Sequence, residues 1–328
     1  MEKIKFLTMA ALATAFFASC SNEDGLPQSN YPADNVVRIT TSVDGMNTRA
    51  SYGNSTDKLK SFGFCIKNAN SEKYTYDNIK VSQKGYNWIP ATQMLWQNST
   101  TAVDILAYAP YQETTEDANG KVKVFGKTDY AFSVKEDQSK AEDYSSDLIV
   151  FKQTGFTPVL ELNTSKAVEV AFTHLLSQLN LIIELRDQFN TNNNTVTKGF
   201  VTDVKVNGTI ISSKVDFSAS PISVQVDGTQ TAAITPETTG FTPAENATAH
   251  AVFNYSAIVI PQTVAAGNFS ISFKVNNTEY IWTATDAVTF ESGKKHELHL
   301  LAGKDVVQGG AISAIPWGDE TITEKETD

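Results

Sequence analysis

The feature that most limits the fold of this chain is a series of short apolar runs separated by clusters of glycine, proline and asparagine. Each run has the length of a β-strand, about 4–8 residues. The clearest runs are 37–43, 62–66, 103–108, 168–172, 179–185, 201–206, 222–226, 252–260, 269–275 and 280–282. Apolar and polar residues alternate in several of them, and alternation places one set of side chains on one face of a sheet. The pattern therefore predicts an all-β protein built from antiparallel sheets.

Turn residues divide these runs into hairpins and into two halves. Asn276-Asn277 is predicted to join the strand 269–275 to the strand 280–282, and Asn207-Gly208 is predicted to form another turn, because both dipeptides tolerate positive φ. The stretch 154–164 contains glycine and proline between two strand-rich halves of similar size. We therefore expect an N-terminal domain over 36–160 and a C-terminal domain over 161–328.

The first 35 residues have the features of an exported lipoprotein. Lys3 and Lys5 precede an apolar run that is too short to span a membrane, so 1–19 is predicted to be a signal peptide. The segment 17–20 resembles a bacterial lipobox, which implies cleavage between Ser19 and Cys20 and acylation of Cys20. Residues 20–35 would then form a lipidated, flexible tether. An ordinary signal peptide with an incidental cysteine is the alternative.

The charge of the chain limits its partners. It carries 26 basic and 37 acidic residues, a net charge of −11. Nucleic acid binding needs clustered lysine and arginine, so we expect no nucleic acid partner. Glu23 and Asp24, shortly after Cys20, resemble the acidic export tag of surface-displayed lipoproteins, which implies an outer-membrane, cell-surface location.

No common catalytic motif occurs in the sequence, so we expect no enzyme, no catalytic residue, no cofactor and no metal site. His296 and His299 form the tightest histidine pair, but on a strand their side chains would point to opposite faces. Cys65 lies between apolar neighbours, which favours a buried thiol over a nucleophile.

Two further groups leave alternatives open. Glu142, Asp143 and Asp147 could supply the paired carboxylates of a glycosidase, or could belong to a solvated loop. Trp88 and Trp96 could stack on sugar rings, although aromatic residues of β-proteins are more often part of the core.

Five local patterns, in this order and spacing, resemble the fimbrillin family of type V pilins and their lipoprotein relatives. They are the lipobox at Cys20, the strand 36–43 followed by 48–51, the segment 170–179, and the late segments 290–300 and 312–317. The resemblance implies two transthyretin-like antiparallel β-sandwich domains in tandem. It also implies cleavage between Arg49 and Ala50 by an Arg-specific surface protease, followed by polymerisation through strand exchange.

Within that expectation, 36–43 is the strand that is removed, and 309–323 is the candidate donor strand. Alternation places Val37, Ile39, Thr41 and Val43 on one face of the removed strand. The candidate donor residues are Ile312, Ile315, Trp317 and Ile322. Arg49 could instead be an uncut loop residue, and the tail could instead complete its own sandwich.

The resulting functional hypothesis is a structural subunit, stalk or tip, of a cell-surface fimbria used for adhesion. Its expected partners are other fimbrial subunits, the outer-membrane lipid reached through acylated Cys20 before maturation, and a host or bacterial receptor. The alternative is a surface lipoprotein that does not polymerise and binds glycan or protein through its loops.

Overall fold

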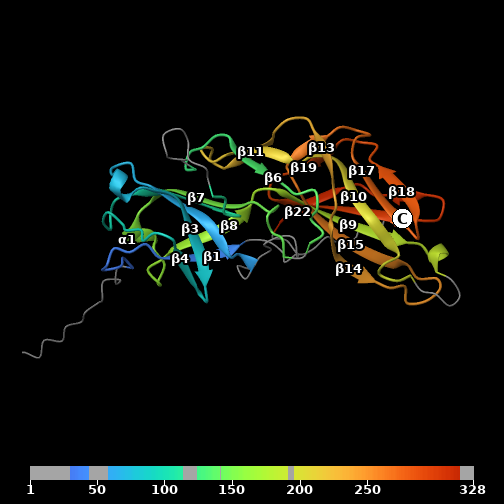
Figure 1. The fold of residues 1–328 in the computed structure, drawn as a ribbon, viewed down its shortest axis with the longest axis horizontal. Helices are drawn as coiled ribbons and strands as arrows, with labels where there is room; N and C mark the ends of the chain where they lie inside the picture. Colours follow the sequence, from blue (N-terminus) through green and yellow to red (C-terminus); the bar gives the residue numbers. More distant parts are fainter. Residues whose placement is uncertain (1–29, 44–57, 114–123, 141, 191–195, 318–328) are drawn as a thin grey trace, which may run out of the picture.

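The computed structural model describes residues 30–43, 58–113, 124–140, 142–190 and 196–317 (Figure 1). These residues form strands and three short helices, α1 (Pro158–Glu161) and the 3₁₀ helices η2 (Glu72–Tyr74) and η3 (Asp187–Phe189). No helix in the described ranges has the length and apolar character that a membrane span requires. The predicted all-β class is therefore confirmed.

A seven-stranded sheet occupies one end of the elongated molecule (Figure 1). In spatial order its strands are β1 (Ile39–Val43), β8 (Val168–His174), β7 (Ile149–Phe156), β5 (Val103–Ala109), β2 (Ser61–Lys67), β3 (Tyr76–Lys84) and β4 (Asn87–Pro90). The two edge strands, β1 and β4, also contact each other. The sheet must therefore curl, and its concave side encloses a core.

The other described residues form four further sheets. The six-stranded sheet contains β14 (Glu237–Thr242), β15 (Ala251–Val259), β9 (Ser177–Leu185), β20 (Lys294–Ala302) and β21 (Val307–Gly309), with β22 (Ser313–Pro316) also paired to β20. The four-stranded sheet contains β13 (Thr231–Ile234), β10 (Val201–Ile210), β17 (Ser270–Val275) and β18 (Thr278–Thr283). The small sheets contain β12 (Ser223–Val226), β11 (Ser212–Asp216) and β6 (Tyr130–Ser133), and β16 (Gln262–Val264) with β19 (Val288–Phe290).

Two apolar clusters form the core. One cluster lies inside the curled first sheet and includes Phe62, Phe64 and Phe172. The other includes residues of the six- and four-stranded sheets but reaches into the first half through Tyr108 and Leu148. Strand β6, from the first half of the chain, also joins a sheet with β11 and β12. The two halves of the chain are thus connected by shared core and shared sheet.

The chain changes sheets later than the boundary predicted at residue 160. Strand β8, residues 168–174, pairs with β1 and β7 in the first sheet. The next strand, β9, begins at Ser177 and belongs to the six-stranded sheet. The buried residues Val168, Val170 and Phe172 belong to the core of the first sheet, which explains the later crossing. That the halves are separate transthyretin-like domains stays a prediction.

Strand directions depart from the wholly antiparallel expectation at two pairings. Strand β1 runs parallel to β8, and β20 runs parallel to β9. Both pairings join segments far apart in the sequence, so no tight hairpin imposes the antiparallel direction.

One predicted turn is confirmed and one is wrong. Asn276 and Asn277 have φ values of 47° and 69° and join β17 to β18 in a hairpin. Asn207-Gly208 instead lies within β10, where the pairing register shifts and Gly208 has φ of 92°. A Cβ at Gly208 would lie 1.9 Å from the carbonyl oxygen of Asn268, so this bulge admits only glycine.

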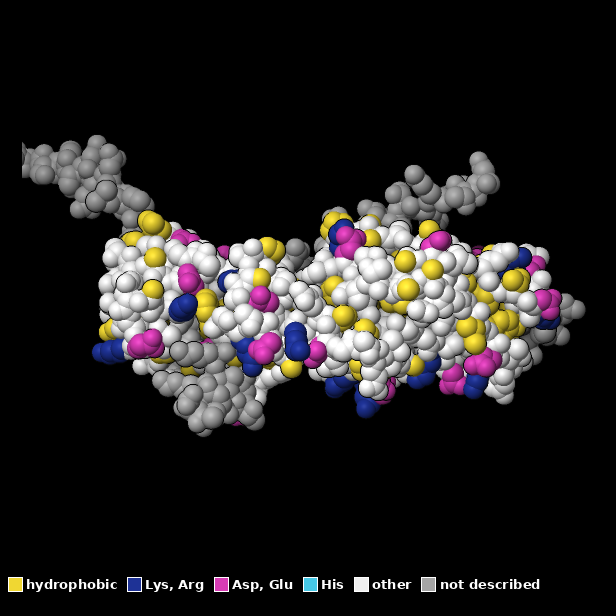
Figure 2. Space-filling view, turned by 90° about the horizontal axis from the view of Figure 1, so that it is seen from above, with side chains coloured by type: hydrophobic (Ala, Val, Ile, Leu, Met, Phe, Trp, Pro, Cys, Tyr) yellow, Lys and Arg dark blue, Asp and Glu magenta, His cyan; other side chains and the backbone are white. Residues whose placement is uncertain are grey.

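On the face of the molecule that Figure 2 shows, hydrophobic side chains are scattered among polar atoms, and basic side chains are interspersed with acidic ones. This face presents no broad positive patch. It therefore gives no support to a nucleic acid interface.

Candidate functional site

Five predicted site residues lie outside the described residues, namely Ser19, Cys20, Arg49, Ala50 and Ile322. Lipidation of Cys20 and cleavage after Arg49 accordingly remain predictions. The other predicted residues belong to two segments, one at each end of the described chain.

The first strand is held at two places. Residues 39–43 pair in parallel with 168–172 of β8. Immediately before them, the amide of Val37 donates to Met94 O at 3.0 Å and the amide of Trp96 donates to Asn35 O at 2.8 Å. We use the term first-strand groove for the surface that 36–43 occupies, formed by β8, 94–96 and the core beneath them. The pairing with 94–96 was not anticipated from the sequence.

Three of the four residues predicted to share one face of the first strand are buried in the core. Val37, Ile39 and Val43 are 2%, 7% and 6% exposed and belong to the core of the first sheet. Thr41 lies between the last two and opposite the buried Val170. An apolar face of this kind contributes most of the free energy that holds a strand on a sheet.

Aromatic side chains form the floor of the first-strand groove. The rings of Phe62 and Phe172 lie 5.3 Å apart, and Trp96 stacks on Phe156 at 5.7 Å. Trp96 is 3% exposed, so it is a core residue and not a sugar platform. Trp88 packs edge to face on Phe62, which also assigns most of its surface to the core.

Beyond the contacts of 35–37 with 94–96, the outer edge of the first strand is open. Within the described residues β1 pairs only with β8, so it is an edge strand. A pocket of about 480 Å³ lies beside it and is lined by residues of the first strand and of β4, among them Ile39, Trp88, Ile89 and Met94. Over residues 39–43 the strand is therefore bound along one side only, and its detachment would break the hydrogen bonds to β8 and to 94–96 without disrupting the interior of the sheet.

The C-terminal segment lies in its own sheet. Strand β22 pairs with residues 294–297 of β20, and only Ile315 of its four residues is partly buried. Trp317 directly follows, is 4% exposed, and stacks on His174 with ring centroids 4.0 Å apart. His174 Nδ1 in turn lies 2.9 Å from Asp147 Oδ1. We call this unit of β22, Trp317, His174 and Asp147 the C-terminal clasp.

Three of the four predicted donor residues already have contacts within this chain. Ile312, Ile315 and Trp317 all contact or belong to the chain's own second core or sheet. They could serve a neighbouring subunit only after these contacts had broken. Nothing in the sequence indicates the His174–Trp317 stack, because the two residues are far apart and each also fits an ordinary strand.

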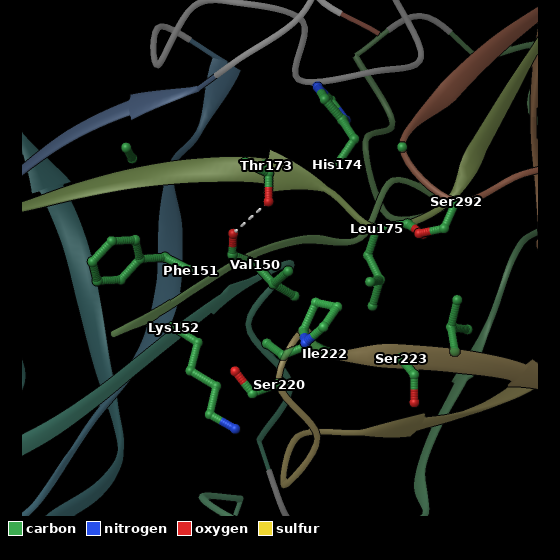
Figure 3. A pocket seen from close by; sticks show the side chains of 14 residues that line it. Val150, Phe151, Lys152, Thr173, His174, Leu175, Ser220, Ile222, Ser223 and Ser292 are labelled. Atoms are coloured by element: carbon green, nitrogen blue, oxygen red, sulfur yellow. Dashed lines mark hydrogen bonds between the residues drawn. The ribbon is translucent and has the colours of Figure 1, made fainter. Parts of the chain in front are cut away.

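A further pocket of about 630 Å³ lies where β7 and β8 diverge (Figure 3). The ammonium of Lys152 donates to the carbonyl oxygens of Phe217, Ser218 and Ala219 at 2.9, 2.9 and 2.8 Å. Figure 3 shows the His174 ring turned away from the pocket. The cation at the pocket wall is thus already bound by backbone, and hydroxyl and apolar side chains form most of the remaining lining.

The other candidates for chemistry lie apart. Cys65 is fully buried and donates to Asp77 at 3.1 Å, and burial raises the pKa of its thiol, as expected for an inert core cysteine. His296 is buried and His299 exposed, which confirms their opposite faces. In the described part of the chain, no group of three histidine, cysteine, aspartate or glutamate side chains is arranged so that it could hold a metal ion.

The acidic residues do not form a catalytic pair either. Asp143 forms an ion pair with Lys135 at 2.6 Å near the surface. Asp147 is fully buried and contacts His174. The two carboxylates therefore have different partners and different solvent exposure.

Comparison with known proteins assigns the family. A family model described as fimbrillin-like matches residues 48–317, which is most of the chain. This protein therefore belongs to the fimbrillin-like family, and the resemblance found in the sequence is confirmed. No curated protein sequence matches the chain.

Solved structures show the same fold at low identity. A candidate cell adhesion protein of Bacteroides ovatus matches with a TM-score of 0.60 and 14% identity, covering 88% of this chain and 99% of that one. One from Bacteroides uniformis gives 0.56 and 18%, covering 87% and 100%. A fimbrial protein of Bacteroides vulgatus gives 0.51 and 17%, covering 86% and 99%.

Proposed function

We propose that this chain is a structural subunit of a cell-surface fimbria used for adhesion. It is exported as a lipoprotein precursor attached to the outer membrane through acylated Cys20, and an Arg-specific protease cuts it between Arg49 and Ala50. It then assembles with other fimbrial subunits by donor-strand exchange at the first-strand groove. Its membership of the fimbrillin-like family supports the class of function.

The observation that carries the proposal is the position of the first strand. It lies at a sheet edge, yet it buries Val37, Ile39 and Val43 in the core. Loss of the strand would expose that core and leave the edge of β8 unpaired. An extended segment from another subunit would restore both the hydrogen bonds and the apolar contacts, which is β-augmentation.

The distribution of arginine supports cleavage at one site. The sequence contains three arginines, Arg38, Arg49 and Arg186. The carbonyl of Arg38 accepts from Val168 N at 2.8 Å, and the amide of Arg186 donates to Ala302 O at 3.0 Å. A protease needs an accessible, extended backbone, and both of these sites are engaged in pairing with distant segments.

The candidate donor segment fits the first-strand groove less well than the first strand itself does. Residues 309–323 remain the candidate donor, but β22 and Trp317 would first have to leave the C-terminal clasp. Of Ile312, Ile315, Trp317 and Ile322, only Ile315 and Trp317 have the two-residue spacing of the inward face of the first strand. A second copy of this chain would therefore fill the groove only partly.

The test compares Arg49→Lys with Arg186→Lys, two changes that keep the charge and remove an arginine site. N-terminal sequencing of the cell-surface protein should give Ala50 for the natural chain and for Arg186→Lys. The Arg49→Lys protein should keep its acylated Cys20 and form no fibres. Fibres of Arg49→Lys that retain residues 20–49 would overturn the mechanism. A natural protein that stays monomeric with intact acyl-Cys20 would instead support the non-polymerising surface lipoprotein.

A further inference from the structure

Two adjacent threonines in β1 have opposite environments. The Thr40 hydroxyl accepts from Asn163 Nδ2 at 3.0 Å and donates to Val168 O at 3.4 Å. Thr41 Oγ1 is buried and has no hydrogen-bond partner among the described residues. The outward threonine is thus matched to its surroundings, whereas the inward one is not.

The surroundings of Thr41 are apolar. Ile39 and Val43 flank it on the same face of β1, and Val170 lies opposite it in β8. All three neighbours belong to the core of the first sheet. A hydroxyl in such a place has lost its water without gaining a partner, which destabilises the strand that carries it.

Valine has nearly the shape of threonine but carries a methyl group in place of the hydroxyl. An incoming strand with valine or isoleucine at this position would therefore fill the same space without the unpaired polar atom. The chain's own first strand is complementary to the groove at Val37, Ile39 and Val43 and mismatched at one position only. That mismatch favours replacement of the native strand over its retention.

We propose that the first-strand groove selects its donor by the side chain at the position of Thr41, and takes a strand with an apolar β-branched residue there in preference to the native strand. The partner is thus an extended segment with apolar residues at four alternate positions. This selectivity rests on the proposed function, because it operates only where the native strand is exchanged.

The closing experiment uses the full chain, cut after Arg49, and fluorescent peptides that span residues 34–45. One peptide has the natural sequence, the second carries Thr41→Val and the third carries Thr40→Val. Uptake is followed by fluorescence anisotropy. The Thr41→Val peptide should bind about 5- to 100-fold more tightly than the natural peptide, about 1–3 kcal/mol at 1.4 kcal/mol per tenfold. The Thr40→Val peptide should bind more weakly than the natural one, because it loses the contacts to Asn163 and Val168.

The outcomes separate the two proposals. Equal uptake of the natural and Thr41→Val peptides would overturn selection at this position while leaving strand exchange intact. No uptake of any peptide would overturn strand exchange and the selectivity with it. As a measurement that needs no exchange, Thr41→Val in the uncut chain should raise the thermal unfolding temperature and Thr40→Val should lower it. A lower unfolding temperature for Thr41→Val would contradict the mismatch itself.

Discussion

The first and last strands of the described chain both lie at sheet edges, but they are held in different ways. The first strand buries three side chains along its length, whereas β22 has one partly buried residue and depends on the adjacent Trp317. A strand with a continuous buried face leaves a continuous groove when it departs. A segment held at one aromatic residue leaves a single cavity. The difference favours the first-strand groove as the proposed acceptor more than it favours β22 as the proposed donor.

The largest expected effect concerns the aromatic contact of the C-terminal clasp. Trp317→Ala should lower the free energy of unfolding by about 3–5 kcal/mol, because it removes a buried aromatic side chain from its stack on His174. Ile315→Ala, in β22 itself, should cost about 1 kcal/mol, since its side chain is only partly buried. Urea unfolding measures both. Equal losses would mean that β22 as a whole, and not Trp317 in particular, keeps the C-terminal segment on β20.

The matching test of the first strand contrasts its two faces. Ile39→Ala should cost about 2–4 kcal/mol because it opens a cavity in the core of the first sheet. Ser42→Ala, on the exposed face of the same strand, should change stability by less than about 0.5 kcal/mol. The same urea titration applies, and a large loss for Ser42→Ala would show that outward contacts hold the strand.

How far the sequence predicts these features depends on the range of the interaction. Alternation identified the inward face of 37–43, and the Asn276-Asn277 hairpin followed from turn chemistry, because both are local properties. The parallel pairing of β1 with β8 and the bonds from 94–96 could not be predicted, since alternation identifies a buried face but not the neighbouring strand.

The candidate site shows the same division. The residues of the two terminal segments were predicted from their alternation and remain predictions, whereas the His174–Trp317 stack joins two motifs that the sequence gives no reason to place together. The bulge at Gly208 was mistaken for a turn because Asn-Gly favours positive φ in either setting.

Lowering the pH should destabilise the sheet to which β22 belongs. Burial lowers the pKa of His296, which pairs with Ala314 of β22. The unfolded chain therefore binds this proton more readily, so the contribution of neutral His296 is present above about pH 6.5 and is lost as the pH falls. His296→Gln should reduce the loss of stability measured by thermal melting between neutral and mildly acidic pH. An unchanged pH profile would exclude His296 as its source.

The smallest expected effect is at the polar start of the first strand. Arg38 donates to both carboxylate oxygens of Asp34, at 3.0 and 2.6 Å, and this hydrogen bonding lowers the pKa of Asp34 to about 2. Both side chains are largely exposed, so water and salt screen the pair, and its geometry alone does not make it stabilising. Asp34→Asn should therefore leave the unfolding temperature, and the rate at which the cut strand leaves the groove, nearly unchanged in both low and high salt. A release rate that rises sharply in Asp34→Asn would mean that an exposed ion pair retains the first strand. The buried face would then no longer account for the contrast with β22, and the groove would have to recognise the charge of an incoming strand as well as its apolar residues.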